Sequence, residues 1–141
     1  MSKNQAIVVR WTDEVLNRGN LDLVDELFAE DFTWEMPFNP EALHGPAAMK
    51  ETVSAFRAAF TDFAVEVDHV LGEGDEVALT YRASGTNDGE MMGQPPTGES
   101  AEWRVMHVFT LRDGKIVHDV TVLDRMGLIE QLGLTGSPAE A

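Results

Sequence analysis

The chain has 141 residues and a formal net charge of −15, a size that fits one domain with a core of its own. A surface this acidic repels phosphate backbones and anionic membranes, so we expect neither nucleic acid nor a membrane as a partner. The sequence contains no run of about eighteen apolar residues, the length needed to span a bilayer. The absence of cysteine excludes a disulfide framework, a thiolate nucleophile and a cysteine-based zinc site, and we expect a cytoplasmic location.

Apolar residues at helical spacing predict three helices in the N-terminal half of the chain. The first is expected from Asn4 to Arg18 and the second from Leu21 to Ala29. The third begins at Pro46, a residue suited to a first helical turn, and runs to about Phe60. A short strand, Phe32–Met36, is expected between the second and third helices.

Beyond residue 60 the apolar pattern changes to strict alternation, which is typical of half-buried strands. Tight turns between successive strands predict an antiparallel sheet, and helices gathered on one face of it give an α+β fold. We expect a single domain over residues 1–134, in which a strongly curved sheet wraps over the three helices as a cone around an apolar pocket. Residues 135–141 are expected to form a flexible tail. The expected strands are 63–68, 77–85, 100–111 and 116–124, with a last helix over 126–132.

The turn around Asp113-Gly114 decides which side chains of the last two strands meet. A two-residue loop at Asp113-Gly114 would place His107 opposite Val120. A three-residue loop that starts at Arg112 would place His107 opposite Asp119. Both loops accept glycine here, and we favour the three-residue loop.

The favoured register gathers His107, Asp119 and Thr121 on one mainly apolar face of the sheet. An imidazole beside a carboxylate in an apolar pocket has a tunable pKa, which suits proton transfer from a carbon acid. We interpret the three residues as catalytic: Asp119 orients or charges His107, His107 moves the proton, and Thr121 hydrogen-bonds the substrate. The alternative is that imidazole and carboxylate only satisfy each other. The apolar members of this face are Trp103, Val105, Phe109 and Val117.

Other side chains are candidates for binding a small apolar or aromatic ligand. Trp34, Tyr81 and Trp103 could line its pocket, although aromatic residues at strand spacing are also common in plain cores. Met92, on the irregular segment 87–99, could act as an adaptable lid or as filler. Asp124 could reach the pocket mouth or cap the last helix. The predicted substrate-binding residues are Trp34, Tyr81, Met92, Trp103, Val105, Phe109 and Asp124.

The outward face of the last two strands is amphipathic, and we expect it to form a homodimer contact. No metal is expected, because the four histidines lack metal-ligand spacing such as His-Glu-x-x-His. This outward face comprises Arg104, Met106, Val108, Thr110, His118, Val120 and Val122.

Several short motifs occur along nearly the whole chain at a characteristic spacing, and the loop Gly93-Gln94-Pro95-Pro96-Thr97-Gly98 is the most specific of them. With these motifs the chain resembles the SnoaL-like polyketide cyclases, within the nuclear transport factor two-like superfold. The other motifs are Asn17–Asp22, Asp25–Phe32, Gly45-Pro46, Asp113–Ile116 and Asp124–Gly133.

The resemblance implies an α+β cone, often dimeric, with a deep apolar pocket and no metal or organic cofactor. It also implies intramolecular aldol ring closure in a polyketide ester, with an aspartate on the final strand as general acid/base and a histidine on the preceding strand at the reacting carbonyl. His107 matches that histidine, whereas the aspartate position holds Thr121, and Trp34 stands where a small polar residue is common. The alternatives are an epoxide-opening or isomerising enzyme on the same scaffold, and a ligand-binding domain without catalysis.

Overall fold

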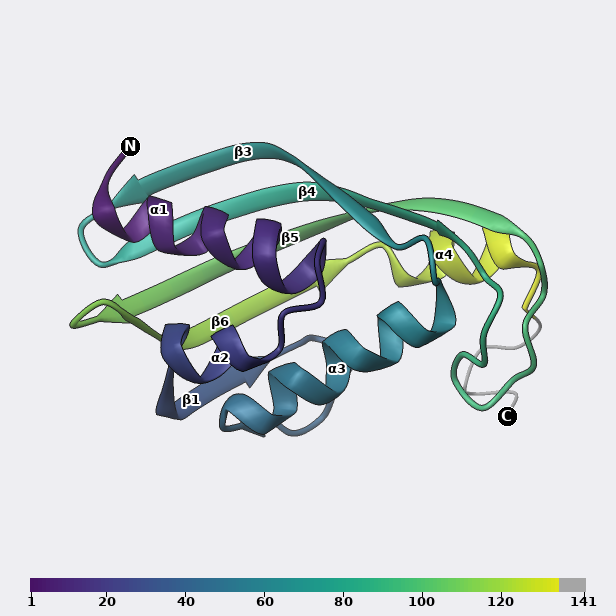
Figure 1. The fold of residues 1–141 in the computed structure, drawn as a ribbon, viewed down its shortest axis with the longest axis horizontal. Coiled ribbons are helices and arrows are strands. Elements are labelled where there is room, and N and C mark those ends of the chain that lie inside the picture. Colours follow the sequence, from purple (N-terminus) through teal and green to yellow (C-terminus); the bar gives the residue numbers. More distant parts are fainter. Residues whose placement is uncertain (135–141) are drawn as a thin grey trace.

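A curved, unclosed sheet of six strands forms the frame of the molecule, and the N-terminal helices pack against one of its faces (Figure 1). The computed structural model describes residues 1–134. The strand order is β2-β1-β6-β5-β4-β3. This arrangement confirms the predicted α+β class. The strands are β1 (Phe28–Glu35), β2 (Leu43–His44), β3 (Ala64–Glu73), β4 (Glu76–Thr86), β5 (Ser100–Arg112) and β6 (Lys115–Leu123).

The first predicted helix is two segments of different winding. The α-helix α1 (Lys3–Arg10) starts at a capping box between Ser2 and Gln5 and continues into a π-helical turn, η1 (Trp11–Leu16). The turn buries Trp11, Val15 and Leu16, as the apolar stripe of the predicted helix indicated, and also Thr12, which that stripe did not include. The other helices are α2 (Asp22–Leu27), α3 (Pro46–Ala59) and α4 (Arg125–Leu132).

The sheet is mixed, where the sequence predicted antiparallel pairing throughout. Strands β3 to β6 pair antiparallel as expected, but β1 runs parallel to β6. A parallel pair needs a long crossover connection, and α3 together with the four strands β2 to β5 supplies it here. The strand β1 also begins at Phe28, so α2 ends earlier than predicted, and the two-residue strand β2 was not predicted.

The hairpin between β5 and β6 corrects the predicted register. Its turn is the two-residue loop, in which Asp113 and Gly114 both have positive φ and Arg112 pairs with Lys115. A β-bulge then shifts the register by one residue, so His107 faces Thr121 and not Asp119. Because of this bulge His107, Asp119 and Thr121 still share the inner face, as the sequence analysis expected.

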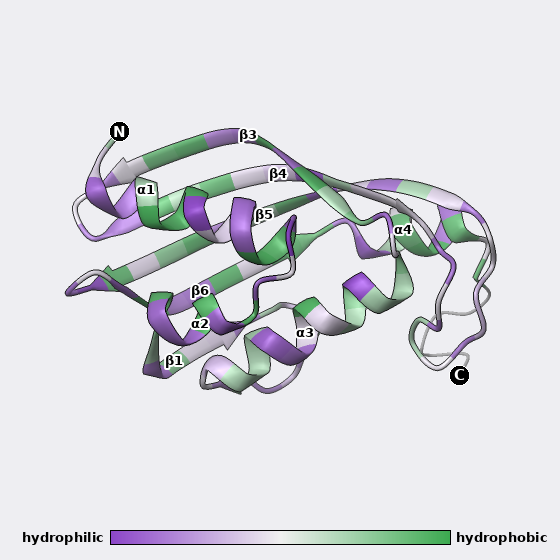
Figure 2. Ribbon diagram, in the orientation of Figure 1, coloured by the Kyte–Doolittle hydropathy of each residue, from purple (hydrophilic) through white to green (hydrophobic). Residues whose placement is uncertain are grey.

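Apolar and polar residues alternate along the strands, and the apolar ones on the inner face form the core (Figure 2). On β4 the predicted inner residues Val77, Leu79, Tyr81 and Ala83 are all buried. Val117, which was expected on the inner face of β6, is only half-buried, because the bulge gives the inward position to Ile116.

Two further expectations concern membrane spans and the C-terminal tail. Within residues 1–134, none of the helices has the length and apolar character needed to cross a membrane. The predicted tail, residues 135–141, lies outside the described residues, so the domain boundary at residue 134 stays a prediction.

Candidate active site

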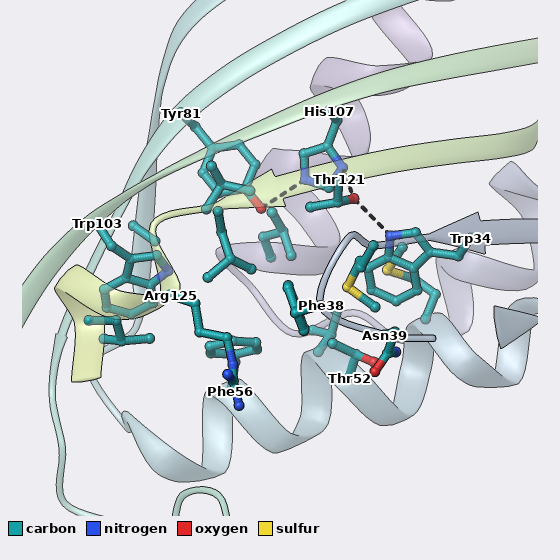
Figure 3. A pocket seen from close by; sticks show the side chains of 18 of the residues that line it. Trp34, Phe38, Asn39, Thr52, Phe56, Tyr81, Trp103, His107, Thr121 and Arg125 are labelled. Atoms are coloured by element: carbon teal, nitrogen blue, oxygen red, sulfur yellow. Dashed lines mark hydrogen bonds between the residues drawn. The ribbon is translucent and has the colours of Figure 1, made fainter. Parts of the chain in front are cut away.

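A cavity of about 320 Å³ lies between the helices and the inner face of the sheet, within the range typical of small-molecule sites (Figure 3). Its walls are mostly aromatic and aliphatic. Among the described residues, no aspartate or glutamate lines it. The aromatic lining consists of Trp11, Trp34, Phe38, Phe56, Phe63, Tyr81 and Trp103.

Most of the predicted site residues line this one cavity. His107 and Thr121 do so, together with the predicted binding residues Trp34, Tyr81, Met92, Trp103 and Val105.

Two predicted binding residues lie elsewhere. Phe109 is fully buried behind His107, with the two rings stacked at a centroid distance of 4.8 Å. Asp124 accepts a hydrogen bond from the backbone N–H of Gly127 at 2.9 Å, so it caps α4 and does not line this cavity.

His107 is held at both ring nitrogens. Its Nδ1 lies 2.9 and 3.0 Å from the two carboxylate oxygens of Asp119, and its Nε2 lies 3.1 Å from the hydroxyl of Tyr81. A carboxylate only accepts hydrogen bonds, so Nδ1 carries the ring proton and donates a hydrogen bond to Asp119. In the neutral imidazole, Nε2 is therefore an acceptor, and the Tyr81 hydroxyl donates to it.

Thr121 bridges the same network from the other side (Figure 3). The indole N–H of Trp34 donates to its hydroxyl oxygen at 2.7 Å, and the hydroxyl in turn donates to Asp119 at 3.0 Å. The single hydroxyl proton is thus engaged inside the protein. Thr121 is therefore placed to hold Asp119 rather than to donate to a substrate, which changes the role predicted for it.

Asp119 is fully buried and lies behind the cavity wall. Its oxygens meet only His107 and Thr121 among the side chains of residues 1–134. The carboxylate can fix the ring orientation of His107 and stabilise an imidazolium, but it does not reach a ligand. Of this hydrogen-bonded group, His107, Tyr81 and Thr121 line the cavity and Asp119 does not.

Tyr81 keeps its proton far into the alkaline range. Burial is the main cause that raises its pKa above the ordinary value of 10.0, and the negative charge of Asp119 raises it further. At neutral pH the hydroxyl is therefore a hydrogen-bond donor and not a phenolate.

We expect the near-ultraviolet absorbance of tyrosinate to show no ionisation near pH 10 in the native protein, and an ionisation there in urea. Tyr81 is the only tyrosine, so the signal belongs to it alone, and Tyr81→Phe should abolish it. Because the folded state binds this proton more tightly, its contribution to the free energy of unfolding is complete below pH 10 and declines above it. A native midpoint near 10 would contradict the burial described here.

The structure adds pocket residues that sequence reasoning missed. Trp11 packs edge-on to His107, with ring centroids 5.2 Å apart, and its buried indole N–H has no acceptor among residues 1–134. The only feature of the sequence that pointed to Trp11 as an inward-facing residue was its position on the apolar stripe of the first predicted helix. Arg125 and Phe38 meet at the cavity wall from segments far apart in sequence.

No cluster of three or more histidine, aspartate or glutamate side chains suited to a metal occurs within residues 1–134.

The family model and the curated relatives point to one family. The family model for SnoaL-like polyketide cyclase matches residues 6–132. Nogalonic acid methyl ester cyclase from Streptomyces nogalater is 30% identical over 123 residues, which cover 83% of this chain and 88% of the relative. Aklanonic acid methyl ester cyclase from Streptomyces galilaeus is 28% identical over 130 residues, covering 92% of this chain and 90% of the relative.

Solved structures share the fold. A SnoaL-like polyketide cyclase candidate from Jannaschia sp. CCS1 superposes with a TM-score of 0.86 at 25% identity, covering 95% of this chain and 94% of the other. An epoxide hydrolase of Mycobacterium tuberculosis, similar to limonene epoxide hydrolases, shares the fold with a TM-score of 0.71 at 15% identity, over 92% of this chain and 89% of the other. From the family model and the cyclase relatives together, the chain belongs to the SnoaL-like polyketide cyclase family.

Proposed function

We propose that this protein closes a ring in a polyketide-like carbonyl compound by a cofactor-free intramolecular aldol reaction, with His107 as the general base and then the general acid. The observation that carries the proposal is the buried chain of hydrogen bonds Asp119–His107–Tyr81, which ends on the wall of an apolar cavity. A positioned acid/base group in an aromatic-lined pocket suits removal of a proton from carbon.

Tyr81 would control when Nε2 of His107 becomes a free base. In the structure the tyrosine hydroxyl donates to that nitrogen. A ligand carbonyl oxygen beside Tyr81 would compete for the same proton, and turning the hydroxyl about its C–O bond would move the hydrogen bond to the ligand. The new hydrogen bond polarises the carbonyl, and a small shift of the tyrosine oxygen away from Nε2 would then open that nitrogen to the α-proton.

In this reaction His107 takes up one proton and later returns it. The α-proton moves to Nε2, the enolate carbon attacks the second carbonyl, and a carbon–carbon bond forms while that carbonyl becomes an alkoxide. The imidazolium then returns the proton to the alkoxide, which leaves the protein unchanged. Asp119 stabilises the imidazolium in between, because the carboxylate lies within 3.0 Å of Nδ1 in a fully buried position.

The test is incubation of the protein with nogalonic acid methyl ester and aklanonic acid methyl ester, the compounds for which the two cyclase relatives are named. We expect ring closure of at least one ester, or of a related compound, with no added metal or cofactor. Product without incorporated solvent oxygen would support the aldol reaction. Binding of both esters without turnover would instead favour a non-catalytic ligand-binding domain.

An epoxide-opening or isomerising reaction on the same scaffold is the second candidate. The fold shared with the Mycobacterium tuberculosis epoxide hydrolase is the observation that favours it. Hydrolysis would place one oxygen from solvent in the product, so reaction in isotopically labelled water separates the two candidates.

The proposed assembly is a homodimer through the outer face of β5 and β6. Its support is the apolar character of that face, where Met106, Val108 and Val122 are about half exposed in the single chain. A cytoplasmic location also stays a prediction from the sequence.

A further inference from the structure

We propose that the cavity has an anion-binding subsite at Arg125, which takes the carboxylate of a flat apolar ligand whose body fills the aromatic-lined space. Naming that ligand a substrate rests on the proposed function and requires a substrate with a free acid group, because the two test esters carry theirs as a methyl ester. The subsite itself does not rest on that function. Arg125 starts α4, directly after β6, and its half-buried side chain forms part of the cavity wall.

The charge of the cavity is opposite to that of the molecule. The chain carries a net charge of −15, yet Arg125 is the one lysine or arginine among the described lining residues, and no described aspartate or glutamate joins it there. A lone cation in an apolar, partly dehydrated wall attracts an anion more strongly than an exposed one does, because the dielectric screening is weaker. This arrangement favours a ligand with a negative group.

Arg125 also differs from the other arginines of residues 1–134 in its partners. Within residues 1–134 its guanidinium forms no ion pair; it lies 5.3 Å from the ring centroid of Phe38 and 3.7 Å from the sulfur of Met92. Arg57 donates to two backbone carbonyls, so its role is structural. The basic residues that do pair with carboxylates are Arg10, Arg18, Lys50, Arg82, Arg104 and Arg112.

Phe38 and Met92 restrict where the guanidinium can go. Stacking against an aromatic face leaves the edge N–H donors of arginine available, and those donors match the two oxygens of a carboxylate. Figure 3 shows Arg125 well separated from His107 across the cavity. A carboxylate held at Arg125 would therefore orient the ligand with its other end toward His107 and Tyr81.

The test compares naphthoate with its methyl ester, which share the same flat body and differ in charge. Binding is measured by quenching of tryptophan fluorescence, because Trp11, Trp34 and Trp103 line the cavity. For the wild-type protein we expect Kd for the acid to be about tenfold lower than for the ester. Arg125→Gln should remove this preference by weakening the acid about tenfold while the ester changes less than about twofold.

Two further variants sharpen the result. Arg125→Lys should retain only part of the preference, because an ammonium lacks the planar pair of donors. Arg104→Gln is the matched control, since Arg104 lies on the outer face of β5 and should leave both Kd values unchanged.

An ester that binds as tightly as the acid, an acid preference that survives Arg125→Gln, or no binding of either probe would each overturn the subsite. None of these measurements involves turnover. Failure of ring closure with an intact acid preference would thus count against the proposed function alone, and ring closure without the preference against the subsite alone.

Discussion

Replacement of His107 by alanine is expected to slow ring closure by about 10²–10⁴-fold, the usual contribution of a general acid/base. The imidazole is the only titratable group that both contacts Asp119 and lines the cavity in residues 1–134. Without it, neither removal of the α-proton nor protonation of the alkoxide has a donor or acceptor in place. The measurement is kcat for the ester that the protein turns over.

The alanine variant also leaves a hole beside Trp11 and Phe109, so its fold must be checked by urea unfolding. His107→Gln keeps most of the volume and should lose turnover to a similar extent. His69→Ala is the matched control, because His69 is exposed on the edge strand β3. If both His107 variants fold and keep kcat within about threefold of wild type, His107 is not the acid/base group.

Removal of the Asp119 carboxylate should affect stability and turnover differently according to the replacement. Asp119→Ala leaves Nδ1–H of His107 and the Thr121 hydroxyl without an acceptor in a fully buried site, and we expect a loss of about 3 kcal/mol in the free energy of unfolding. Asp119→Asn retains an acceptor oxygen, so its loss should be about 1 kcal/mol.

Turnover should fall in both variants, by about 10²-fold or more, because a neutral amide cannot stabilise the imidazolium. The asparagine variant is therefore the decisive one: near-native stability with low kcat identifies electrostatic support of His107. Full turnover in Asp119→Asn would reduce Asp119 to a structural hydrogen-bond partner. Asp31→Asn, at an exposed carboxylate paired with Arg112, is the control and should change stability by less than about 1 kcal/mol.

Local periodicity was sufficient for most of the fold. The helix α3, the four strands β3 to β6 and the N-cap at Asp124 follow from patterns within a few residues, and the structure confirms them. Strand alternation also identified the inner face of β4, because a strand with one buried face permits a single assignment of side chains.

Long-range pairing was not predictable in the same way. The parallel contact of β1 with β6 and the meeting of Arg125 with Phe38 join segments that local patterns treat as independent. The hydrogen bond between Tyr81 and His107 is an example. Tyr81 was expected only as an aromatic residue of the pocket wall, and the pairing of β4 with β5 brings its hydroxyl to Nε2 of His107.

The hairpin at Asp113-Gly114 separates the two sources of information most clearly. The sequence alone determined that a turn lies there and that an imidazole and a carboxylate sit on neighbouring strands. Tertiary packing decided which residues face each other: the tight turn satisfies local backbone geometry, while burial of Ile116 and Asp119 on one face requires a bulge between them. Register depends on what the whole core can bury, and no single segment carries that information.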